Sequence, residues 1–137
     1  MMLPVQPGPY YVMHFALLEK IRTTTDEPTM IALCKQDVDI AEDFVRDWRV
    51  YEHESIHQRI MNAIDIGIHA PDIQEHGLPR YPSFLTLAIY YEKHGKYQAA
   101  IDICEQALAL GLTIEHTKSG TAGRIARLRK KLEGASK

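Results

Sequence analysis

The chain has 137 residues and a mass of 15.6 kDa, which corresponds to one domain of ordinary size. Apolar residues make up 45% and charged residues 25% of it, a composition that excludes a disordered chain, a collagen and a disulfide-rich scaffold. The net charge of -2 hides an uneven distribution, because residues 1–79 carry thirteen acidic and six basic side chains and residues 80–137 carry five and ten. The net charge argues against general nucleic-acid binding, and the uneven distribution favours a charged partner or a second copy of the chain.

The cysteines and the N-terminus predict a reducing compartment. Cys34 and Cys104 lie within helical apolar patterns and lack Cys-x-x-Cys spacing, so we expect buried thiols and no disulfide. The first residues contain Pro4, Pro7 and Pro9 but no basic stretch of the kind that opens a signal peptide. Since no apolar run reaches the ~20 residues that span a bilayer, we expect a cytoplasmic protein without a membrane partner.

Apolar residues recur at three- and four-residue spacing almost throughout, which predicts an all-α domain of about six helices. Helices are expected over 11–22, over 27–50 and over about 54–66. Residues 10–66 would then form a helical hairpin followed by a third helix. The seam expected along the second helix consists of Met30, Cys34, Val38, Ala41, Val45 and Trp48.

The second half of the chain follows a connecting loop predicted over 67–82, where glycine and proline recur. A helix beginning near Phe84 is expected to stop at His94-Gly95, where glycine suits a C-terminal cap. The next helix is expected to end at Gly111, and a last helix is expected over 120–133. Two helices joined by so short a connection must fold back on each other.

The residues of this helical pair match a repeat with a known spacing. They are Phe84, Leu87, Ala88, Tyr91, Gly95, Tyr97, Ala100, Cys104 and Ala107. Over 83–112 the chain resembles the tetratricopeptide repeat, although Leu112 stands near the position of the usual closing proline. This resemblance implies stacked helical hairpins, with 10–66 including a degenerate copy of the repeat and 120–133 as a capping helix.

The ending of the chain resembles that of small bacterial and phage-associated proteins of this kind. In those relatives the last helix follows a Thr-Lys-Gly-Gly stretch and a Gly-Arg pair, and here the chain reads Thr117-Lys118-Ser119-Gly120 and then Gly123-Arg124. The resemblance implies a fold and a binding role, without an activity or a cofactor.

The leading hypothesis is a non-catalytic protein-interaction module, because stacked helix pairs expose a surface that binds peptides or proteins. Tyr90 is rotated about 100° from the packing residue Tyr91, so we expect it to anchor a ligand. The expected partner-binding residues are Tyr90, Lys93, His94, Arg124 and Arg127. They predict an acidic peptide or a second copy as the ligand.

One alternative is a zinc-dependent hydrolase. The stretch from His53 to His57 matches H-E-x-x-H, in which two imidazoles one helical turn apart hold zinc and Glu54 acts as general base. A third ligand would have to come from residues further along: His69, Asp72, Glu75 or His76. Because the surrounding sequence is strongly polar, we interpret the motif as an exposed helical stretch and expect no metal.

A second alternative is a phosphate or nucleic-acid binder. Residues 117–124 mix Gly, Ser, Thr and Lys before a helix, and the helix itself carries Arg124, Arg127, Arg129, Lys130 and Lys131. The order of a nucleotide-binding loop is missing, so we expect a helix cap followed by a solvated basic helix.

Overall fold

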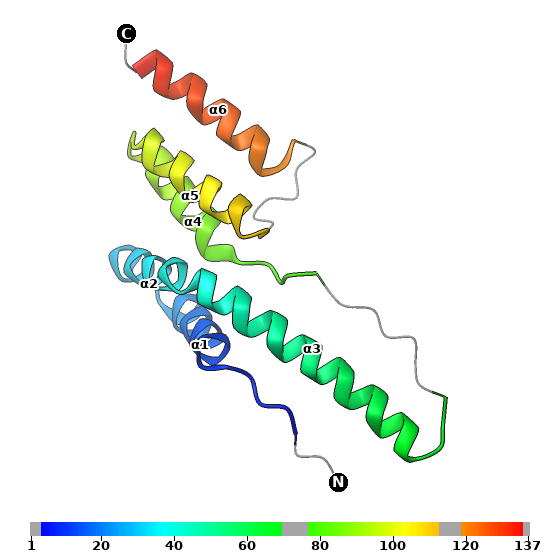
Figure 1. Ribbon diagram of the computed structural model, residues 1–137. Helices are drawn as coiled ribbons and strands as arrows, with labels where there is room; N and C mark the ends of the chain where they lie inside the picture. The colour runs from blue at the N-terminus through cyan, green and yellow to red at the C-terminus, as the bar shows by residue number, and fades with distance from the viewer. Residues whose placement is uncertain (1–3, 70–76, 113–118, 136–137) are drawn as a thin grey trace.

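The computed structural model describes residues 4–69, 77–112 and 119–135, and Figure 1 shows them folded into helices. The helices are α1 (Pro9–Thr23), α2 (Glu27–Asp39), α3 (Ala41–Asp65), α4 (Pro82–Lys93), α5 (Tyr97–Ala109) and α6 (Gly120–Ala135). No strand occurs within these described ranges, and the predicted all-α class with six helices is confirmed. None of the described helices is long and apolar enough to cross a membrane.

The helices form a series in which α1 packs on α2, α2 on α4, α4 on α5 and α5 on α6 (Figure 1). The exception is α3, whose first half packs on α1 and whose second half extends away from the other helices. A core of buried side chains runs through the series from Ile31 in α2 to Leu128 in α6. Each helix therefore depends mainly on its neighbours, as in stacked helical arrays.

The single helix predicted over 27–50 is wrong, because the chain turns at Ile40, between α2 and α3. No glycine or proline marks the turn, and the apolar spacing continues across it: Val38, Ala41 and Val45 are all buried. The reason is tertiary, since α2 and α3 both pack on α1 and α2 also packs on α4. One straight helix could not place both segments along α1.

The boundary predicted between helices near residues 50–54 is also wrong, because α3 is continuous from Ala41 to Asp65. Residues 50–54 contain neither glycine nor proline that would end a helix. The helix ends at Asp65, and Gly67, two residues further on, has φ +76°, a conformation that suits glycine. The Ile68 N–H then donates to the Ala63 carbonyl oxygen at 3.1 Å, which closes the helix end.

The two helices predicted over 83–112 are present as α4 and α5, and they pack on each other. Pro82 opens α4, and Gly95 takes φ +72° where α4 ends. Ala88 of α4 and Ala100 and Ala107 of α5 are fully buried. Small side chains at these positions let the helix axes approach closely.

Ion pairs complement the apolar contact of α6 with the repeat. Arg129 lies 2.7 Å from Glu105 of α5, and Lys131 lies 3.5 Å from Glu92 of α4. Ile125 and Leu128 provide the buried face of α6. Since exposed ion pairs contribute little, these two apolar residues supply most of the attachment.

Candidate functional site

The described structure places Tyr90 and Lys93 in a groove between α2 and α4. The groove has a volume of about 220 Å³ and is lined by Glu27, Met30, Ile31, Thr86, Ile89, Tyr90 and Lys93. The side chain of Ile89 is 43% exposed there, and Tyr90 is half-buried against the core. The groove thus has an apolar floor, with one acidic and one basic residue among its lining.

Two neighbouring rings contact the ring of Tyr90. Its ring lies 5.7 Å from the Tyr91 ring in an edge-to-face arrangement and 4.5 Å from the His94 ring. Such contacts restrict the rotamers of the tyrosine before any ligand arrives. His94 is exposed at the end of α4, and its ring supports Tyr90 from that side.

The two arginines predicted to join this surface are not among the residues that line the groove. Arg124 lies 4.0 Å from Glu92 on α4, with its side chain only 14% exposed. Arg127 donates to the Ser119 hydroxyl oxygen at 3.3 Å, next to the start of α6. The structure therefore brings Tyr90, Lys93 and His94 together and places both arginines with partners of their own.

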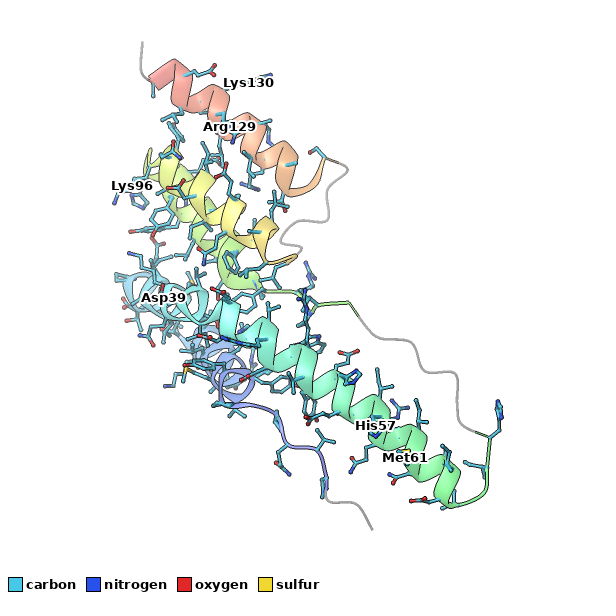
Figure 2. All side chains as sticks on the ribbon, in the orientation of Figure 1. Asp39, His57, Met61, Lys96, Arg129 and Lys130 are labelled. Carbon is cyan, nitrogen blue, oxygen red and sulfur yellow. The ribbon has the colours of Figure 1, made fainter. Side chains whose placement is uncertain are left out.

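His53 and His57 are exposed on α3, and the label of His57 in Figure 2 lies on the part of the helix that extends from the body. Within the ranges that the structure describes, no three histidine, cysteine or acidic side chains are grouped to hold a metal ion. Of the third ligands considered, His69 is described and exposed, whereas Asp72, Glu75 and His76 lie outside the described residues.

The candidate phosphate-binding stretch is described only from Ser119 onwards, and Thr117 and Lys118 lie outside the described residues. Gly120 has φ +62°, and Thr121 is buried in the first turn of α6. The Ser119 carbonyl oxygen accepts a hydrogen bond from the Gly123 N–H at 3.0 Å. These contacts belong to an ordinary helix beginning.

A buried polar cluster, which the sequence did not reveal, joins α1, α2 and the start of α4. Its centre is the Asp37 carboxylate, whose Oδ1 lies 2.6 Å from His14 Nδ1. The Tyr81 hydroxyl donates to the same Oδ1 at 2.9 Å and also to the Asp37 carbonyl oxygen. The Ser83 hydroxyl donates to Oδ2 at 2.6 Å. His14, Asp37 and Tyr81 are fully buried and Ser83 nearly so.

The hydrogen bonds to Asp37 indicate a structural role for the cluster. A buried carboxylate requires several hydrogen-bond partners, and here one side chain of α1 and two of the segment that opens α4 contact it. The order of groups differs from a hydrolase triad, because the carboxylate is central and both the imidazole and the serine hydroxyl bond to it. Burial raises the pKa of the Tyr81 hydroxyl far above its ordinary value, and the charge of Asp37 adds to this effect. Tyr81 thus remains a neutral donor.

Aromatic rings enclose the imidazole of His14. Its ring stacks on Tyr81 at 4.2 Å and lies 4.3 Å from Phe44. Its Nε2 atom is buried and makes no hydrogen bond within the described part of the chain. The residue that could have indicated this cluster is Asp37, an acidic residue beside Val38 and three positions after Cys34 on the buried face of α2.

No protein-family model, curated protein or solved structure matches this chain.

Proposed function

We propose that this chain is a non-catalytic protein-interaction module that binds a peptide segment in the groove between α2 and α4. The observation that carries the proposal is the shared location of Tyr90 and Lys93. The repeat spacing predicts that both side chains face outward. They line one groove together with apolar side chains of α2. Helical grooves with an apolar floor and a few polar groups are common peptide-binding sites.

The composition of the groove favours a peptide with one large apolar side chain and a nearby carboxylate. Met30, Ile31 and Ile89 would contact the apolar side chain, and Lys93 would attract the carboxylate. Tyr90 would anchor the peptide, because a ring held by its neighbours loses little entropy on binding. Arg124 and Arg127 would influence the approach of the ligand only through long-range charge.

The experiment is site-specific photo-crosslinking from inside the groove. A photoreactive amino acid replaces Ile89, and a matched variant carries it at Leu108, which is 47% exposed on α5 and does not line the groove. We expect one partner segment to be recovered from the Ile89 position alone. Equal recovery of the same segments from both positions would contradict the proposal.

A synthetic copy of the recovered segment then allows affinity to be measured by calorimetry. We expect Tyr90→Ala to weaken binding about tenfold or more, as for an aromatic hot spot. Lys93→Glu should weaken it further if a carboxylate is recognised. Circular dichroism spectra of both variants should match that of the wild type, because neither side chain is fully buried.

A further inference from the structure

A cluster of aromatic rings on α1 and α3 forms a second surface, whereas the groove is lined by residues of α2 and α4. We call it the aromatic face: Tyr11 and Phe15 of α1 with Trp48 and Tyr51 of α3. The Tyr11 ring is central, stacking on Trp48 at 5.8 Å and contacting Phe15 at 4.9 Å. The Tyr51 ring lies 5.0 Å from Tyr11 on the side of α3. Four rings from two helices thus form one connected layer.

This layer lies at an end of the helix series where solvent reaches apolar side chains. Phe15 is 41% exposed and its neighbour Val12 is 54% exposed, while Tyr11, Trp48 and Tyr51 are half-buried. The exposed positions of α6, at the other end, include four basic residues: Arg127, Arg129, Lys130 and Lys131. Helical arrays need polar outer faces at their ends, so an apolar end indicates a surface that binds another molecule.

Two acidic residues of α3 are neighbours of the aromatic residues. Asp47 and Glu52 occupy positions on α3 beside Trp48 and Tyr51, and Asp47 Oδ2 accepts a hydrogen bond from the Tyr10 N–H at 2.8 Å. Burial raises the pKa of the Tyr11 hydroxyl, and Tyr51 and Glu52 raise it further. Two carboxylates, those of Asp47 and Glu52, therefore accompany the rings, within the half of the chain that carries the excess of acidic residues.

We propose that the aromatic face binds an arginine-rich segment of a partner protein. The guanidinium group is planar and weakly hydrated, so it can stack on tyrosine, tryptophan and phenylalanine rings while Asp47 and Glu52 balance its charge. The chain itself contains a related contact, since Lys35 Nζ lies 6.0 Å from the centre of the Tyr91 ring. The surface is separate from the α2–α4 groove and does not depend on the function proposed for it.

A second copy of the chain fits this surface less well than a separate basic segment. The basic residues of α6 are the obvious source of cations in a second copy, but three of them pair with acidic residues of their own chain. Arg124 and Lys131 pair with Glu92, and Arg129 pairs with Glu105. In self-association, the aromatic face would have to compete with these ion pairs for the basic residues of α6. A separate arginine-rich segment would not have to break them.

Trp48 allows binding at this surface to be followed directly, because it is the only tryptophan of the chain. The probe is a peptide of about nine arginines, titrated into the purified protein at low salt while Trp48 fluorescence is recorded. We expect a saturable change that weakens as salt is added, and no change with an oligoglutamate of equal length. Absence of a saturable change with the arginine peptide would overturn the proposal.

Variants separate binding to the rings from general attraction to acidic protein. We expect Phe15→Ala and Tyr51→Ala each to weaken binding several-fold, to about tenfold, and Glu52→Gln to weaken it by a smaller factor. The control Leu108→Ala removes an equally exposed apolar side chain from α5 and should leave the affinity unchanged. Equal affinity in the wild type, Phe15→Ala and Tyr51→Ala would overturn the proposal.

Self-association is measured on the same samples. We expect Trp48 fluorescence to be independent of protein concentration and the chain to sediment as a monomer in the absence of peptide. If instead fluorescence changes with protein concentration and Lys130→Glu abolishes that change, the ligand is a second copy and the proposal is wrong. Circular dichroism confirms that each variant is folded.

Discussion

The α4–α5 contact and the joint between α1, α2 and α4 hold helices together by different means. In α4 and α5, fully buried alanines let the two helices approach closely. Other pairs of apolar helix faces with small side chains could pack in the same way. At the joint, Asp37 receives hydrogen bonds from side chains of α1 and of the segment that opens α4. Since hydrogen bonds are directional, the joint fixes one orientation, whereas the apolar contact mainly supplies stability.

The difference matters for the groove, because the groove lies between the same two helices that the joint connects. Asp37 and Ser83 link α2 and α4 near one end of their contact, and Met30 and Tyr90 line the groove nearer the other end. A change at the joint should therefore alter the width of the groove, whereas a change between α4 and α5 should mainly alter stability.

The largest effect is expected from Asp37→Ala. This substitution leaves the hydroxyls of Tyr81 and Ser83 and the imidazole of His14 buried without their acceptor. We expect the free energy of unfolding to fall by about 3–5 kcal/mol, measured by chemical denaturation. Asp39→Ala is the control, since Asp39 is exposed on the same helix and its loss should cost about 0.5 kcal/mol or less. Equal stability of the two variants would contradict the role assigned to the hydrogen bonds of Asp37.

A smaller loss is expected from overpacking the apolar contact. Ala107→Trp or Ala100→Trp places an indole where the side chain is fully buried, and we expect a loss of about 2–3 kcal/mol. Ala109→Trp, at an exposed position of the same helix, should change the melting temperature little. A melting temperature of Ala107→Trp close to that of the wild type would contradict the packing described for α5.

The smallest effect at neutral pH is expected from Tyr81→Phe, which removes one donor to Asp37 at a cost of about 1 kcal/mol. The variant differs more in alkali. The folded protein raises the pKa of Tyr81, so the group stabilises the fold fully below the unfolded-state pKa of about 10 and loses this contribution as the pH rises above it. Denaturation above pH ~10 should show a shallower loss of stability in Tyr81→Phe, and equal slopes would contradict the burial described for this hydroxyl.

The sequence predicted the α4–α5 pair well because local signals and packing agree there. Pro82 and Gly95 mark the ends of α4, and residues at three- and four-residue spacing form the buried face. The resemblance to a tetratricopeptide repeat and the binding role remain predictions, since the helical architecture alone is compatible with many functions.

The parts that could not be predicted depend on contacts between distant residues. The turn at Ile40 has no local signal, and it allows both α2 and α3 to pack on α1. The polar cluster is equally hidden, because Asp37 and Ser83 are 46 positions apart in the chain. Of the predicted binding residues, Tyr90 and Lys93 share a groove because they lie on one helix, while Arg124 is held by Glu92 from another helix.

The sequence separation of the polar cluster also bears on the order of folding. Contacts among α4, α5 and α6 join helices that follow each other along the chain, so little loop entropy opposes their formation. The hydrogen bonds of Asp37 with Tyr81 and Ser83 close a loop of more than forty residues that includes the whole of α3. We therefore expect the C-terminal helices to assemble early and the docking of α1 and α2 through Asp37 to be the slow step that completes the folded chain.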